Sequence, residues 1–397
     1  MPRPSPDHDP LASAPSNVPV WEEGGWRPLP VLAADVEADV CVVGLGGSGL
    51  SAVRESTRLG QRVVGIDAGR VAGGAAGRNG GFLLAGTAAF HHNAVRELGR
   101  ERAIRLYRRT LDEVGRIVHE APDAASRVGS LRIADSAEEL VDCRAQLVAM
   151  EAHGLPVQAY AGPEGEGLLF PEDAAFQPLR RCRALAHAAL DEGASLYEGT
   201  PAVAIVAPSR ASPGRAEVRT PGATIRAGAV IVAVDGRIEQ VLPELEGRVR
   251  TARLQMIATA PTDDLRLARP VYRRYGFEYY QQTSDGRIAL GGFRDHGGAN
   301  EWTSEGTPGQ AVQDRLERYL RERLGVRAPV THRWAASVGF TSDILPVFAQ
   351  VRPRVWAIGG YNGTGNVIGA ILGRAAARLA ATGAADDAEL FGYASGS

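Results

Sequence analysis

A glycine-rich turn between two apolar segments constrains this chain more than any other feature. Val40–Val43 is a short apolar run, typical of a strand that is buried on both faces. Gly44, Gly46 and Gly49 follow as G-x-G-x-x-G, then a helical segment, and then residues 62–66 as a second strand. This order predicts a dinucleotide-binding βαβ unit, in which a diphosphate meets free N–H groups at the helix N-terminus.

An acidic residue stands where such a unit needs one. Asp67 closes the second strand, and its carboxylate can accept hydrogen bonds from an adenosine ribose while repelling a 2′-phosphate. A lone glycine motif is a weak signal in a chain with 48 glycines, but the strand, the helix and the acid all stand in the expected positions. The pattern disfavours NADP and leaves NAD and FAD open.

Composition excludes several classes of protein. All 44 basic residues are arginine, so a lysine Schiff base, a P-loop lysine and a lysine general base are impossible. A net charge of −2 without a basic stripe argues against nucleic acid, and no apolar run is long enough to cross a membrane. The histidines and cysteines show no metal-ligand spacing. Three widely spaced cysteines and the lack of a signal peptide predict reduced thiols in the cytoplasm.

The chain is expected to be an α/β protein with a discontinuous Rossmann-like cofactor domain and an α+β substrate domain built on a mostly antiparallel sheet. Residues 1–35 are expected to form an extended arm that Trp21 and Trp26 can pin to the body, with disorder as an alternative for about the first fifteen residues. We assign 36–120, 165–250 and 335–385 to the cofactor domain, 121–164 and 251–334 to the substrate domain, and 386–397 to a C-terminal tail.

Periodicity and turn residues predict the elements that connect these parts. Helices are expected over 91–119, 138–153, 171–190, 310–324 and 366–379, and strands over 131–133, 195–197, 203–206, 229–234, 288–290 and 355–358. Tyr275, Phe277 and Tyr279 are expected on one face of a strand, followed by a turn at Asp285 and Gly286. A second glycine turn, 359–365, is predicted between a strand and a helix.

The chain resembles the D-amino acid oxidase and glycine oxidase family of FAD-dependent oxidoreductases, and most closely its amine-oxidising members of the γ-glutamylputrescine oxidase type. The likeness runs from Asp39 to about Ala381. It is carried by VVGLGGSGLS with GIDA, GAAGRNGG, VIVAVDG, DGRIALGG, WAASVGFTSDILPVF and VWAIGGYNGTGN, in that order. The resemblance implies FAD rather than NAD, with the flavin ring between the two domains.

The glycine-rich loop after Asp67 suits a backbone that passes close to a flat ring, and the second glycine turn opens a helix whose positive end can stabilise negative charge. The candidate FAD-binding residues are Gly44, Gly46, Gly47, Ser48, Gly49, Asp67, Ala68, Arg78, Asn79, Gly80, Gly81, Val203, Gly236, Gly360, Tyr361, Asn362, Gly363, Thr364 and Gly365. Because residues 334–343 lack the cysteine to which sarcosine oxidases of the family attach flavin, the FAD is expected to be noncovalent.

By analogy with the family, the enzyme takes a hydride from the carbon that bears an amine and leaves an imine, so no strong general base is required. Amino acid oxidases of the family clamp the substrate carboxylate with the arginine of G-x-R-P, whereas this chain has Gly339 to Ser342, GFTS. An amine without an α-carboxylate is therefore the favoured substrate, although Arg294 or Arg273 can replace the clamp. Tyr279 and His91 are further pocket candidates, and no catalytic residue is assigned.

Dioxygen is the expected electron acceptor. The lysine that some family oxidases place beside flavin N5 is missing here, so a dehydrogenase that passes electrons to a quinone or carrier protein remains an alternative. A flavin-bound scaffold protein without turnover is a third hypothesis. The amine and the oligomeric state are not fixed by the sequence.

Overall fold

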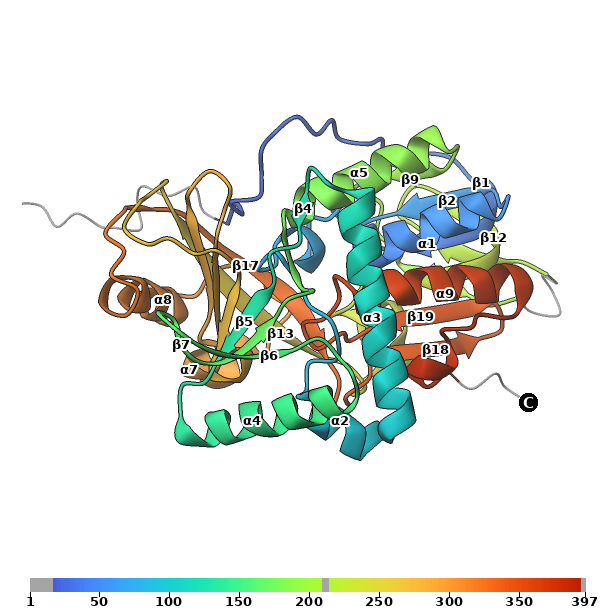
Figure 1. Cartoon of the computed structure of the whole chain (residues 1–397). Coiled ribbons are helices and arrows are strands. Elements are labelled where there is room, and N and C mark those ends of the chain that lie inside the picture. Colours follow the sequence, from blue (N-terminus) through green and yellow to red (C-terminus); the bar gives the residue numbers. More distant parts are fainter. Residues whose placement is uncertain (1–16, 209–213, 394–397) are drawn as a thin grey trace, which may run out of the picture.

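The computed structural model describes residues 17–208 and 214–393, which form two large sheets and a small third one. The first large sheet and its helices lie on the right of Figure 1, and the second lies on the left. The helix α3 (Arg100–Glu120) runs down the middle of this view. Each large sheet corresponds to one of the two expected domains.

The first sheet has a parallel centre built from distant parts of the chain. β9–β2, β2–β1, β1–β12 and β12–β19 are parallel pairs, so the last strands of the chain complete the sheet that the first strands begin. This confirms the predicted discontinuous, Rossmann-like arrangement. In order, its strands are β10 (Ala204–Val206), β11 (Ala216–Arg219), β12 (Thr224–Val232), β1 (Val36–Val43), β2 (Val63–Ile66) and β9 (Ser195–Tyr197), with β19 (Val355–Gly359) beside β12 and β18 (Val347–Arg352) beside β19.

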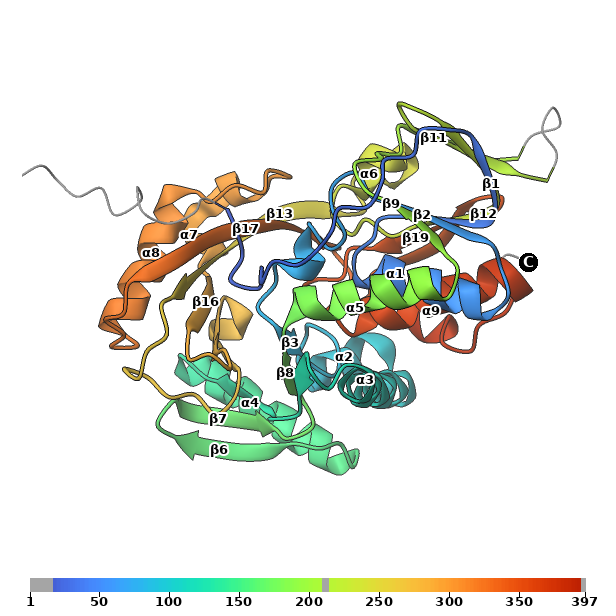
Figure 2. The same ribbon diagram turned by 90° about the horizontal axis from the view of Figure 1, so that it is seen from above.

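Three helices cover one face of this sheet. α1 (Gly47–Arg58) packs against both α5 (Pro178–Asp191) and α9 (Ile368–Thr382), and Figure 2 shows the three together on the same side of β1 and β2. A Cβ atom on Gly373 of α9 would overlap the backbone of Ser48, so α1 and α9 touch through their backbones. This close packing fixes the start of α1 against the sheet.

The second sheet is antiparallel except for the pair β14–β5. Leu131, Ile133 and Leu290 on one face are buried together with apolar residues of α8 (Gln310–Glu322), and α4 (Ala137–Ala152) packs on β7. α4 covers part of the opposite face, where it is buried against Leu168 and Phe170 of β7, and the rest of that face lines a site between the sheets. In order, the strands are β17 (Val330–Phe340), β13 (Arg250–Thr259), β16 (Ile288–Gly292), β15 (Glu278–Gln282), β14 (Val271–Arg273), β5 (Ser130–Ile133), β7 (Gly165–Phe170) and β6 (Gln158–Gly162).

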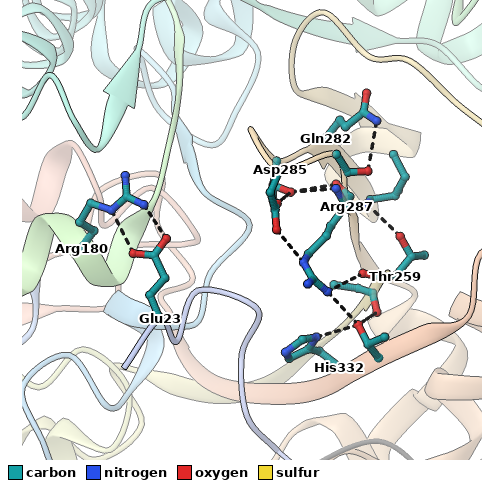
Figure 3. A network of polar contacts seen from close by, with 12 residues as sticks. Glu23, Arg180, Thr259, Gln282, Asp285, Arg287 and His332 are labelled. Carbon is teal, nitrogen blue, oxygen red and sulfur yellow. Dashed lines mark hydrogen bonds and ion pairs between the residues drawn. The ribbon is translucent and has the colours of Figure 1, made fainter. Parts of the chain in front are cut away.

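The turn predicted between β15 and β16 is confirmed. Gly286 has φ of +87°, which favours glycine, and its N–H donates to the carbonyl of Thr283 at 2.9 Å. Arg287 pairs with Asp285 at 2.7 Å and donates to the carbonyl of Thr259 at 3.2 Å, which ties the turn to β13 (Figure 3).

Two predicted helices were wrong in part. The segment 91–119 is two helices, α2 (His91–Leu98) and α3, because Gly99 has φ of +81° and breaks the helical backbone. Residues 171–177 are not helical, since β8 (Ala174–Phe176) pairs with β3 (Phe82–Leu83) and β4 (Ala125–Ser126) in the small sheet.

The remaining short elements are α6 (Ile238–Val241), α7 (Arg294–Gly297) and the 3₁₀ turns η1 (Ala75–Gly77), η2 (Pro243–Leu245), η3 (Arg274–Gly276), η4 (Gly298–Glu301) and η5 (Glu389–Phe391).

The prediction that Tyr275, Phe277 and Tyr279 lie on one face of a strand was also wrong. Arg274 and Tyr275 have positive φ values of 46° and 54°, so the chain turns there and β15 begins only at Glu278. Tyr275 is 49% exposed, whereas Tyr279 is buried. Tyr272 of β14 takes the place beside Tyr279, with their ring centroids 5.8 Å apart.

The N-terminal arm is bound to the body where the structure describes it. The indole N–H of Trp21 donates to the carbonyl of Asn79 at 2.7 Å, and that of Trp26 donates to Glu198 at 2.9 Å. Glu23 pairs with Arg180 of α5 (Figure 3). The predicted pinning by both tryptophans is confirmed, and the part of the arm for which disorder was an alternative lies outside the described residues.

The domain boundaries stay our proposal. Both β7, which we assigned to the cofactor domain, and β17, which extends past residue 334, pair in the second sheet. In the expected tail, Leu390 and Phe391 are buried in the core. None of the helices in the described ranges combines the length and apolar character that a bilayer crossing requires.

Candidate active site between the two sheets

The glycine turn after β1 is formed as the sequence predicts. Gly44 has φ of +99°, and a Cβ atom there would lie 2.6 Å from the carbonyl oxygen of Ala233. A Cβ atom on Gly49 would overlap the carbonyl of Gly44, so this glycine serves close packing of α1 on β1. Because no side chain caps the start of α1 at Gly46, its first N–H groups are free to bind a phosphate.

Asp67 lies at the end of β2, beside this turn. Its carboxylate accepts hydrogen bonds from the N–H groups of Leu45 and Gly69, both at 2.8 Å. Burial raises the pKa of Asp67, and these two N–H groups lower it. Asp67 and Ala68 line the same cavity as the glycine turn, in the position that a ribose-binding carboxylate requires.

The loop at Arg78 to Gly81 is held rigidly by the side chain of Asn79. Its oxygen accepts from the N–H of Gly81 at 2.9 Å, and its NH₂ group donates to the carbonyl of Ala76 at 2.9 Å. Asn366, which precedes α9, also donates to Asn79 at 3.1 Å. The loop is therefore fastened to the second glycine turn.

Arg78 is a partly buried cation without an acidic partner among the described residues. Its guanidinium donates to the carbonyl of Ala335 at 2.8 Å and to the carbonyl of Asn17 at 2.8 Å. All its partners are neutral oxygens, and burial lowers the pKa of Arg78. Asn17 belongs to the N-terminal arm, so the arm holds a residue of the cavity wall, a role that no local sequence pattern indicated.

Asp235 organises the second glycine turn. One carboxylate oxygen accepts from the N–H groups of Gly360 and Tyr361 at 3.0 and 3.1 Å, and the other accepts from the N–H of Gly339 at 3.0 Å. Burial raises the pKa of Asp235, and these backbone N–H groups lower it. The carboxylate of Asp235 thus ties together β12, β17 and β19, and Gly236 beside it lines the cavity.

A single cavity of about 1460 Å³ joins these parts to the second sheet. Gly49, Gly81, Val203 and Gly360 do not line it, and Val203 is 63% exposed. The other candidates for cofactor binding do: Gly44, Gly46, Gly47, Ser48, Asp67, Ala68, Arg78, Asn79, Gly80, Gly236, Tyr361, Asn362, Gly363, Thr364 and Gly365.

The four substrate candidates separate into two groups. Tyr279, Arg294 and His91 line the cavity, whereas Arg273 points elsewhere and pairs with Asp135 at 2.7 Å. Tyr279 packs against Gly80, since a Cβ atom on that glycine would lie 3.0 Å from the ring.

His91 is buried and lies 2.9 Å from a ring nitrogen of His153. Burial lowers the pKa of His91 to about 4, with a further contribution from His153, so His91 is neutral near pH 7. A buried neutral imidazole of this kind can exchange hydrogen bonds but does not supply a positive charge.

Sequence reasoning missed the polar groups on the second sheet and near it. Tyr107 of α3, Arg132 of β5, Asp173 before β8 and Tyr272 of β14 all line the cavity. Only one of them had a local signal. Arg132 alternates with the buried Leu131 and Ile133 in a short strand, which places it on the other face of the sheet.

The site fits FAD on several independent observations. The uncapped helix start can hold the diphosphate, Asp67 can hold the ribose, and Arg78 to Gly80 with the second glycine turn can flank the flavin. The volume exceeds the roughly 300–1,000 Å³ of an ordinary ligand pocket, which leaves room for a second ligand. No cysteine lines the cavity within the described residues.

Comparison with known proteins identifies the family. The model of the DAO family, "FAD dependent oxidoreductase", matches residues 39–379. The chain is 28% identical to a probable oxidoreductase OrdL of Rhizobium meliloti (strain 1021) over 89% of this chain and 86% of that protein. It is 26% identical to gamma-glutamylputrescine oxidoreductase of Escherichia coli (strain K12), with the same coverage.

The fold is that of solved structures in the same group. The crystal structure of glycine oxidase from Geobacillus kaustophilus superposes with a TM-score of 0.73 over 87% of this chain and 95% of that chain, at 19% identity. L-proline dehydrogenase from P. horikoshii gives a TM-score of 0.71 at 18% identity, over 91% and 96% of the two chains. The chain therefore belongs to the DAO family and is an FAD-dependent oxidoreductase.

Proposed function

We propose that this enzyme oxidises a C–N bond of a small amine and that dioxygen accepts the electrons, with release of peroxide. The two glycine turns, Asp67 and the loop at Arg78 would hold FAD, which would supply the redox chemistry as the hydride acceptor, so that the amine leaves as an imine for water to hydrolyse. The observation that carries the proposal is one cavity that joins the glycine turn and Asp67 to the tyrosines of the second sheet.

An amine without an α-carboxylate is supported by the stretch Gly339 to Ser342. The hydroxyl of Thr341 donates to the carbonyl of Asp343 at 2.9 Å, and no arginine stands at this place. The relative from Escherichia coli is named for oxidation of gamma-glutamylputrescine, which supports an amine substrate here. The wall for such a substrate is formed by Tyr272 and Tyr279.

Use of dioxygen is supported by the partly buried cation Arg78. Reduction of dioxygen builds up negative charge on oxygen, and a cation in a low-dielectric site stabilises that charge. Arg78 lines the cavity and is paired only with neutral oxygens, so its charge is not cancelled by a carboxylate. We propose that it replaces the lysine that this chain lacks.

We also propose that the enzyme works in the cytoplasm. Cys41, Cys143 and Cys182 are free and buried, which supports a reducing compartment. Burial raises the pKa of each thiol, to about 12 for Cys41 and to about 11 for the other two, so these thiols are unreactive.

The experiment mixes FAD-loaded enzyme anaerobically with a panel of primary and secondary amines and records loss of the flavin absorbance. Admission of air then tests the acceptor. One peroxide released per amine consumed supports the oxidase, whereas dye reduction without peroxide supports the dehydrogenase. If no amine bleaches the flavin, the scaffold hypothesis replaces the enzyme mechanism.

A further inference from the structure

A row of side chains crosses the second sheet on the face that lines the cavity. Arg132 of β5 pairs in register with Tyr272 of β14, Tyr272 pairs with Tyr279 of β15, and Tyr279 pairs with Gly291 of β16. The absence of a side chain on Gly291 lets the Tyr279 ring lie across β16, because a Cβ atom there would overlap it. The row runs from the flavin-binding loop at Gly80 to Arg132.

The guanidinium of Arg132 has no carboxylate within ion-pair distance in the described parts of the chain. It lies 4.4 Å from the ring centroid of Phe90, and its one hydrogen bond, to Gln146, is long at 3.4 Å. Arg273, its neighbour one strand away, pairs fully with Asp135 at 2.7 Å. Arg132 therefore keeps its donors available for a ligand.

Two hydroxyl groups stand close to Arg132 and share its lack of partners. The hydroxyls of Tyr107 and Tyr272 make no hydrogen bond among the described residues, and both side chains line the cavity. Tyr107 is only 5% exposed. Burial raises the pKa of Tyr272 to about 12, Arg132 lowers it and Asp173 raises it. Tyr107 is buried in one cluster with Phe90, the ring over which the Arg132 guanidinium lies, so Tyr107 belongs to the same group.

Asp173 is the carboxyl group beside this cluster, and its oxygens are already engaged. One accepts from the N–H of Ala85 at 3.0 Å, and the other accepts from the hydroxyl of Ser130 at 2.6 Å. Asp173 forms no ion pair with Arg132 in the described structure. The free donors of the cluster thus outnumber its free acceptors, which favours an anionic ligand.

Distance decides which kind of anion fits. Arg132 stands two strand spacings from Tyr279, which is about 10 Å. Tyr279 packs against Gly80, the loop that flanks the expected flavin. A carboxylate on the carbon that bears the amine would stay beside Gly80, whereas one several bonds away would reach Arg132.

We propose that Arg132, Tyr107 and Tyr272 form a subsite for a carboxylate at the far end of the substrate, so that the preferred substrate is an amine with a remote carboxylate. This inference rests on the proposed amine oxidation and adds the substrate class. Arg294, another cavity arginine that has no ion-pair partner among the described residues, is the competing anchor. Its guanidinium lies 4.6 Å from the Trp302 ring centroid and 5.0 Å from that of Phe340.

The subsite can be tested by binding alone, with hexanoate and its neutral analogue hexanamide. Titration calorimetry on FAD-loaded enzyme is expected to show binding of hexanoate, a dissociation constant about 10- to 100-fold higher in Arg132→Met, and partial recovery in Arg132→Lys. Arg144→Met is the matched control, because Arg144 is an exposed arginine of the neighbouring helix α4. An unchanged dissociation constant in Arg132→Met, or equal binding of the two ligands by wild type, overturns the proposal.

Turnover gives a second, separate readout with 6-aminohexanoate and 6-aminohexanamide. The ratio of their kcat/KM values is expected to favour the carboxylate and to fall about 10- to 100-fold in Arg132→Met. A fall in Arg294→Met but not in Arg132→Met refutes the assignment. If neither compound reduces the flavin while hexanoate still binds through Arg132, the subsite stands and the proposed amine oxidation fails.

Discussion

Replacement of Asp235 by asparagine is expected to loosen the second glycine turn. The carboxylate accepts three backbone hydrogen bonds, and an amide of the same size can accept at only one atom. The asparagine oxygen can keep the bonds from Gly360 and Tyr361, so the N–H of Gly339 is left facing an NH₂ group. That loss costs about 1–3 kcal/mol, and the change from a charged to a neutral acceptor weakens the two remaining bonds by about 1 kcal/mol each.

Relief of the buried charge offsets part of this cost, because burial already raises the pKa of Asp235. We expect Asp235→Asn to lower the free energy of unfolding by about 3 kcal/mol. Guanidinium denaturation of the FAD-free protein measures this change. Since Tyr361 and Asn362 line the cavity, a fluorescence titration is also expected to show weaker FAD binding.

Asp343→Asn is the matched control. Asp343 lies in the same group of loops, but its side chain is exposed and its nearest side-chain partner is Ser342 at 3.5 Å. This variant is expected to stay within about 0.5 kcal/mol of wild type. If Asp235→Asn also stays within that range, the carboxylate does not organise the turn and the reasoning is refuted.

Three further variants test other parts of the site. Gly291→Ala places a methyl group where the Tyr279 ring lies, so kcat/KM for the amine is expected to fall about tenfold with FAD content retained. Arg78→Met removes this partly buried cation and is expected to slow reoxidation in stopped-flow mixing with air about 100-fold. Because burial raises the pKa of Asp173 to about 7, wild type loses stability, by at most about 4 kcal/mol, as pH rises toward 7, and Asp173→Asn removes this dependence.

For each of these three variants, one result would contradict the prediction. An Ala variant at Gly291 with wild-type kcat/KM would show that Tyr279 is not part of the substrate wall. Equal reoxidation rates in Arg78→Met and wild type would remove the argument for dioxygen. For Asp173, the thermal midpoints of wild type and variant are compared between about pH 5 and pH 8, and a constant difference across that range would show that the carboxyl does not titrate there.

Local sequence patterns predicted the parts of the fold that depend on neighbouring residues. The turn at Gly44, the place of Asp67 at the end of β2 and the hairpin at Gly286 could all be predicted, because each is set by backbone conformation or by residues close in sequence. The break at Gly99 was missed since a glycine inside a helical pattern is often tolerated. The strand β8 was missed because its partners lie far away in the chain.

The substrate side of the site could not be predicted in the same way. Tyr107, Arg132 and Tyr272 meet only because β5 pairs in parallel with β14 and α3 crosses beside them. Each of these residues alone is an ordinary surface or core residue. Arg273 is the opposite case. The sequence offered it as a substrate-binding candidate, but in the folded chain it pairs with Asp135 and does not line the cavity.

The central claim is that this cavity holds FAD between the glycine turn that follows β1 and the face of the second sheet that carries Tyr272 and Tyr279. The most direct measurement is the visible absorbance spectrum of the purified protein, before and after incubation with FAD and removal of the excess. We predict the flavin bands at about one FAD per chain. A colourless protein that stays colourless after this treatment would contradict the account.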